Sequence, residues 1–229
     1  MLVRFLQCYC IVVNTKSNET GEVRSAYVYC TSGPRKDSVL VVQGESKDIL
    51  GDYYFAGQNK KGKLIYILGN LAKGKTANTL KLSFPALNAS MEVPYDEANM
   101  SFKFLCGQYL CDYVEKDEET GDETTSYIYS AIWDTQKGSL TWGDSYSMDG
   151  IIYGDPENGT IVEFADNGSW SGYNVSAIRF EMFSKKEAVK ANRIGALISF
   201  IYPFMQKMKD NNSASRKSNF VPANFSIIK

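Results

Sequence analysis

The side chains in this sequence best suited to chemistry are aromatic rings and carboxylates that share one turn-rich region. An aromatic ring offers a flat apolar platform for a sugar, and two carboxylates across a glycosidic bond could hydrolyse it. A glycan-binding module needs only the platforms and some polar edges, so we favour binding over hydrolysis. The candidate ligand-binding residues are Trp133, Trp142, Tyr146, Tyr153, Trp170 and Tyr173. The carboxylates among them are Asp134, Asp144, Asp149, Asp155, Glu157, Glu163 and Asp166.

The same residues also fit a purely structural interpretation, which is the commoner meaning of such a pattern. Asp beside Gly is typical of turns, and aromatic residues at alternating positions of a strand usually face a core. The sequence alone therefore does not assign a function, and it names no catalytic residue.

Histidine is absent from the whole sequence. This excludes Ser-His-Asp and Cys-His nucleophilic sites and histidine-ligated metals. The five cysteines contain no CxxC pair, and a disulfide between Cys106 and Cys111 or between Cys10 and Cys30 is as plausible as free thiols. We predict no cofactor and no metal, and the net charge of −1 argues against a nucleic-acid partner.

One motif matches a phosphate-binding loop. Residues 69–76 fit the pattern G-x-x-x-x-G-K-[ST], with Gly69, Gly74, Lys75 and Thr76 at its fixed positions. The mechanism requires a helix that starts at the lysine, whereas residues 77–84 alternate like a strand and run into Pro85. We favour a glycine- and lysine-rich loop between antiparallel strands and keep nucleotide binding as a remote alternative.

Short alternating segments separated by Gly, Asn and Asp predict a mainly β protein. The expected strands include residues 52–56, 63–68, 79–84, 101–105, 125–133, 139–142, 150–153, 160–164 and 175–183. We expect a first hairpin between residues 2–13 and 22–30, turning near Gly21, and a solvated hairpin tip at residues 115–123. Antiparallel strands of this kind form either a barrel or a β-sandwich.

The pattern changes at Ser184, where a capping box with Glu187 predicts the start of a helix. Apolar residues then recur at helical spacing from Ile194 to Met208, interrupted by Pro203. We predict three parts: an antiparallel β domain over 1–183, an amphipathic helix packed on it over 184–209, and a loose segment over 210–229 with a short strand. The longest apolar run, residues 194–205, is too short to span a bilayer.

Four short motifs resemble the calycin-like or lipocalin-like β domains of Bacteroidetes envelope lipoproteins. They begin at Val93 (VPYD), Cys106 (CGQ), Ser147 (SMDGIIYG) and Asn158 (NGTIVEF), and the resemblance covers residues 49–183. It implies a barrel-like or sandwich domain in the cell envelope or outside the cell, without an assigned activity or catalytic residues. No signal peptide is evident, and Cys8 lacks the small preceding residue of a lipobox, so the start could be truncated.

From these observations we expect a non-enzymatic exported or envelope domain that is structural or binds a glycan or a small apolar ligand. A protein partner at the cell surface is a further alternative to these ligands. The alternative from another class is a carboxylate-based glycan hydrolase.

Overall fold

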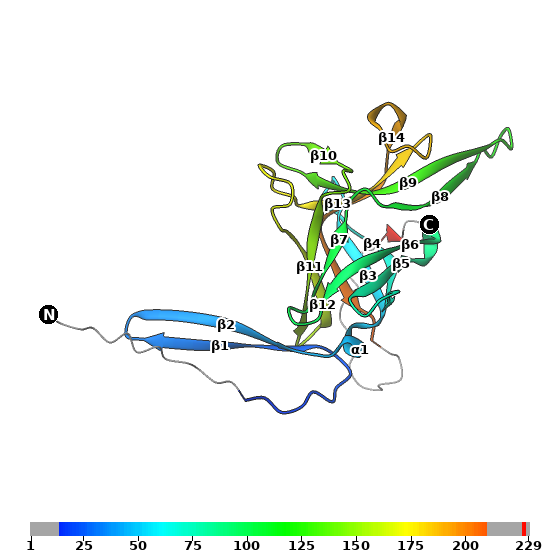
Figure 1. The fold of residues 1–229 in the computed structure, drawn as a ribbon. Helices are drawn as coiled ribbons and strands as arrows, with labels where there is room; N and C mark the ends of the chain where they lie inside the picture. The colour runs from blue at the N-terminus through cyan, green and yellow to red at the C-terminus, as the bar shows by residue number, and fades with distance from the viewer. Residues whose placement is uncertain (1–13, 210–225, 228–229) are drawn as a thin grey trace.

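The computed structural model describes residues 14–209 and 226–227, and its centre is a closed antiparallel barrel of eight strands (Figure 1). Hydrogen bonding runs from β14 through β12, β11, β7, β6, β5, β4 and β3 and returns to β14. The predicted mainly β architecture is confirmed, with a barrel rather than a sandwich. The barrel strands are β3 (Gly51–Gln58), β4 (Leu64–Lys73), β5 (Thr79–Phe84), β6 (Ala89–Asp96), β7 (Ser101–Leu105), β11 (Ser147–Asp155), β12 (Gly159–Asp166) and β14 (Arg193–Lys207).

The barrel interior is filled with aromatic side chains. Leu80, Leu82 and Phe84 of β5 are buried and alternate with more exposed residues, as expected for a strand with one face in a core. Phe55 lies at the centre, with ring centroids of Phe84 at 5.3 Å and Phe200 at 4.9 Å, both edge-on. Because such rings pack closely, the middle of this barrel is an aromatic core.

A side sheet extends from the first half of β14. It contains β13 (Ala177–Phe183), then β9 (Glu123–Asp134), whose neighbours are β10 (Ser139–Thr141) and β8 (Tyr109–Lys116). Phe180 of β13 contacts the barrel core, 5.0 Å between ring centroids from Phe84. The side sheet therefore shares one hydrophobic core with the barrel.

The predicted helix over 184–209 is wrong, because most of this segment is the fifteen-residue strand β14. The reason is a bulge at Tyr202, which has a φ of 51° and interrupts the register with β3 between Ile201 and Phe204. Ile198 and Phe200 face the core before the bulge, and Met205 faces it afterwards. This change of phase breaks the two-residue period, so the apolar residues mimic a helical repeat. The helical elements described are the short α1 (Ser46–Ile49), η1 (Pro85–Leu87) and η2 (Lys190–Asn192).

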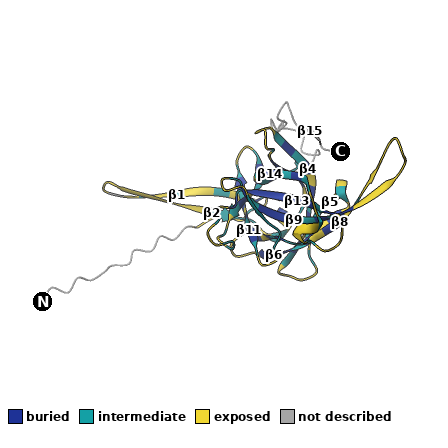
Figure 2. Cartoon of the chain, turned by 90° about the horizontal axis from the view of Figure 1, so that it is seen from above, coloured by how far each residue is buried: buried dark blue, intermediate teal, exposed yellow. Residues whose placement is uncertain are grey.

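A two-stranded arm projects from the barrel and is exposed over most of its length (Figures 1 and 2). It consists of β1 (Arg24–Ser32) and β2 (Arg35–Gln43), with Cys30 opposite Asp37. Among the described residues, β1 pairs with the segment that follows it through a turn at Gly33, and the predicted pairing with residues 2–13 stays untested. Residues 2–13 lie outside the described residues.

The base of the arm is bonded to the barrel. The Val23 N–H donates to Thr160 Oγ1 at 3.1 Å, and the Gly154 N–H donates to Ser25 Oγ at 2.9 Å. A Cβ at Gly154 would lie 2.1 Å from the Val23 carbonyl oxygen and 2.5 Å from Arg24 Cα. Only glycine allows the two backbones to approach this closely.

We therefore expect Gly154→Ala to move the base of the arm off β11. The substitution should raise the hydrogen-exchange rate of the Val23 amide about tenfold or more, because its bond to Thr160 would be lost. It should also cost about 1–3 kcal/mol of stability through overpacking. Gly195→Ala is the matched control, because a Cβ there would meet no atom within 4 Å. Equal exchange in the two variants would show that the arm is not held at Gly154.

The predicted hairpin tip is confirmed, and the structure shows the state of three of the cysteines. The tip of the β8–β9 hairpin is an exposed turn in which Asp117 Oδ1 accepts the N–H groups of Glu119 and Thr120, both at 2.8 Å. Cys106 and Cys111 are buried free thiols, so they do not form a disulfide, and Cys30 is also free. Cys10 lies outside the described residues. Ser226–Ile227 form the short strand β15, parallel to β4, within the predicted terminal segment.

Candidate functional site

Two adjoining hollows on the outside of the barrel meet at Tyr153. The first, of about 570 Å³, lies between the arm and β11 and is lined by Tyr27, Tyr29 and Leu40 of the arm together with Ile151. The second, of about 500 Å³, lies over β12 and β14 and is lined by Ile161, Val175, Tyr202, Phe204 and others. Tyr153, Asp155 and Glu163 line both hollows. We call the two hollows together the Tyr153 groove.

Strand alternation places the groove residues on the outer wall. On β11, Ile152 and Gly154 are buried, whereas Ile151 is 43% exposed and Tyr153 is half-buried. The register pairs Ile151 with Glu163 and Tyr153 with Ile161 of β12, so these four side chains share one surface. The arm then supplies a second wall, on which Tyr27 and Tyr29 are 58% and 74% exposed.

The groove is electronegative around Tyr153. Burial first, and then the charges of Glu163 and Asp155, raise the pKa of the Tyr153 hydroxyl, and Tyr27 adds to this effect. Glu163 is exposed and has no hydrogen-bond or ion-pair partner among the described residues. Asp155 is instead held in a turn, where its Oδ1 accepts the N–H groups of Glu157 at 2.9 Å and Asn158 at 2.8 Å.

Tyr202 enters the groove through the bulge of β14. Its positive φ is uncommon for a bulky residue and persists here because its N–H donates to the Ser176 carbonyl at 2.8 Å. The side chain is 63% exposed, beside the buried Pro203. Sequence reasoning missed Tyr202, Tyr27 and Tyr29, because the bulge and the path of the arm have no local signature.

The structure divides the six predicted ligand-binding residues among separate places. Tyr153 alone lies in the groove. Tyr146 and Trp170 pack against the core, and Trp170 stacks on Tyr173 with 3.9 Å between ring centroids. Trp142 lies against Phe183 at 5.3 Å, donates through Nε1 to the Ala188 carbonyl, and borders a shallow hollow of about 370 Å³ beside Asp144.

Trp133 belongs to a charged cluster on the side sheet. Arg179 lies 5.1 Å from the Trp133 ring centroid and forms an ion pair of 2.8 Å with Glu181, whose other oxygen accepts from Arg193 Nε at 2.7 Å. The Glu181 side chain is fully buried and that of Arg179 is 8% exposed. Burial lowers the pKa of Arg179. The two guanidinium groups neutralise the buried carboxylate, so we assign this cluster a structural role.

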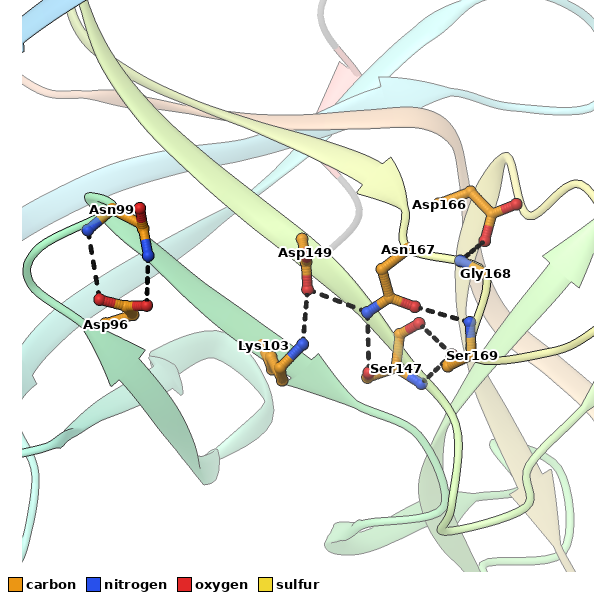
Figure 3. Close-up of polar contacts among 9 residues, drawn as sticks. All are labelled: Asp96, Asn99, Lys103, Ser147, Asp149, Asp166, Asn167, Gly168 and Ser169. Atoms are coloured by element: carbon orange, nitrogen blue, oxygen red, sulfur yellow. Dashed lines mark hydrogen bonds and ion pairs between the residues drawn. The ribbon is translucent and has the colours of Figure 1, made fainter.

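Several predicted carboxylates serve turns and surface pairs. Asp149 Oδ1 accepts from Lys103 Nζ at 3.0 Å and from Asn167 Nδ2 at 2.9 Å (Figure 3). Asp96, which is not one of the predicted carboxylates, accepts the N–H of Asn99 at 3.2 Å and its Nδ2 group at 2.7 Å, and Figure 3 shows this pair apart from the group around Asp149. These bonds support the structural interpretation of the Asp-rich turns.

The phosphate-loop motif forms a turn between antiparallel strands, as we favoured. Gly69 lies within β4, the next element after the motif is the strand β5, and no helix begins at Lys75. The Lys75 N–H donates to Glu92 Oε2 at 3.1 Å. A carboxylate thus accepts an N–H group that a phosphate-binding loop would direct at a phosphate, which argues against nucleotide binding.

Three comparisons with known proteins found no match. No family model matches the chain, and no curated protein or solved structure matches it either. Within residues 14–209 and 226–227, no group of three or more potential metal ligands lies together. No helix in that part of the chain is long and apolar enough to cross a membrane.

Proposed function

We propose that this chain is a non-enzymatic exported or cell-envelope domain that binds a carbohydrate ligand in the Tyr153 groove. The observation that carries the proposal is the placement of Tyr27, Tyr29, Tyr153 and Tyr202 over adjoining hollows on the outside of the barrel. Since aromatic side chains fill the barrel core, the outer wall offers the better binding surface.

The chemistry of the groove suits a sugar. Tyrosine rings provide platforms for the apolar face of a pyranose, while hydroxyl and carboxylate groups accept hydrogen bonds from its edge. Each hollow is about 500–570 Å³, within the usual size range of ligand sites. The envelope assignment rests on the resemblance to Bacteroidetes lipoprotein domains, and fractionation of the native host would test it.

The carboxylates of the groove favour binding over hydrolysis. Asp155 of β11 is paired with Gly159 of β12, and Glu163 lies four residues after Gly159 on β12. The backbone positions of Gly159 and Glu163 are therefore roughly 13 Å apart along the strand. Glycosidases place their two carboxyl groups about 5–10 Å apart. Asp155 is moreover engaged by the turn, where its Oδ1 accepts two backbone N–H groups, and this favours a structural role over that of a second catalytic carboxylate.

A glycan-array screen with the unmodified chain tests the proposal. Tyr153→Ala should weaken binding of any hit about tenfold, as expected for the loss of an aromatic platform. Tyr109→Ala is the matched control, because Tyr109 is 43% exposed on β8, outside the groove. A blank array, or equal weakening by both variants, would contradict the proposal and favour a structural role or a protein partner.

A further inference from the structure

The charged groups around the Tyr153 groove are unequally distributed. Asp155 and Glu163 line both hollows, and among the residues that the structure describes no lysine or arginine lines either of them. Glu22 adds a third carboxylate beside the same turn, since its Oε2 lies 3.3 Å from the position of a Cβ at Gly159. The groove therefore presents negative charge without a cation in its lining.

Two basic side chains close in the fold to the groove, those of Lys209 and Arg24, are bonded to other groups. Lys209 Nζ donates to the Glu157 carbonyl at 3.1 Å, and this bond lies at the turn rather than in the lining. Arg24 donates to Gln43 Oε1 at 2.9 Å through Nε and also binds the Lys16 carbonyl. Neither is paired with Glu163, so the Glu163 carboxylate remains open to a ligand.

Aromatic faces beside carboxylates are the surroundings that a cation prefers. A ring attracts a cation through its negative face, and a carboxylate adds a charge-assisted hydrogen bond. Tyr153 and Glu163 line the same hollows, with Tyr27 on one side and Tyr202 on the other. A protonated amine on a sugar could therefore meet Glu163 while the sugar ring lies on a tyrosine.

We propose that the groove selects an oligosaccharide carrying free, protonated amino groups over the neutral form of the same sugar. This inference rests on the proposed function and specifies its ligand class. Charge complementarity with Asp155 and Glu163 supports it, and an anionic glycan is expected to bind worst.

Two oligosaccharides of equal length test the inference: β-1,4-linked glucosamine oligomers and their fully N-acetylated counterparts. They share one backbone, and N-acetylation removes the positive charge of each 2-amino group while adding an acetyl group, so the Glu163→Gln variant isolates the contribution of charge. Calorimetric titration at mildly acidic pH and low salt should show about fivefold tighter binding of the glucosamine form. The preference should shrink at high salt, because exposed charges are screened.

Glu163→Gln should remove the preference by weakening only the glucosamine form. Glu118→Gln is the matched control, because Glu118 is an exposed carboxylate at the tip of the β8–β9 hairpin. Equal binding of the two sugars by the unmodified chain, or equal weakening of both by Glu163→Gln, would overturn the inference and leave the proposed function standing. Binding of neither sugar, together with a blank glycan array, would overturn both.

Discussion

Glu181→Gln is expected to lower the free energy of unfolding by about 3–5 kcal/mol, because it leaves buried charge without compensation. In the unmodified chain, Glu181 Oε1 forms an ion pair with Arg179 at 2.8 Å that lacks hydrogen-bond geometry, and Glu181 Oε2 accepts a hydrogen bond from Arg193 Nε at 2.7 Å. An amide carries no charge to offset these guanidinium groups. Arg179 should contribute most of this loss, since its Nε already lacks a hydrogen-bond partner among the described residues.

Urea unfolding followed by circular dichroism measures this effect. Lys103→Met is the control, because the Lys103–Asp149 pair is 53% and 37% exposed and should contribute no more than about 1 kcal/mol. Replacing Arg179 and Glu181 together with methionine should recover part of the loss, since apolar residues can substitute for a buried ion pair. A Glu181→Gln variant as stable as Lys103→Met would show that the cluster is solvated.

Phe55→Ala is expected to destabilise the barrel by about 3–5 kcal/mol. Phe55 is fully buried, and its ring lies within 5.4 Å of the rings of Phe84, Phe164 and Phe200, measured between centroids. These neighbours come from three other barrel strands, so they cannot collapse into the space without shifting the strands that carry them. A residual cavity would therefore remain.

Leu68→Ala is the control, because it truncates a side chain on the outer wall of the barrel, whereas Phe55→Ala truncates one in the core. Leu68 lies on β4 and is 46% exposed, so its truncation should change stability by no more than about 1 kcal/mol. Thermal and urea unfolding of the two variants give the required values. Similar losses in both would contradict the assignment of a solid aromatic core inside the barrel.

The candidate site was predictable only in its residue types. Tyrosines and carboxylates in the turn-rich region allowed a glycan-binding surface beside the structural interpretation, and of the six candidate residues Tyr153 lines the groove. Trp133, Trp142 and Trp170 instead pack against Arg179, Phe183 and the core, respectively. Alternation shows that two sets of residues face opposite sides of a strand, but it does not show which side other elements will cover.

The sequence by itself determined the strand content and the tight turns of this protein. β5 and β7 have the predicted bounds, because two-residue alternation and turn glycines act over a few residues. The tertiary structure alone decided the closure of β3 on β14, the bulge at Tyr202 and the pairing of β1 with β2. Closure and the bulge depend on contacts between residues distant in the sequence, which local alternation does not encode. The same contacts bring Tyr27, Tyr153 and Tyr202 to one groove.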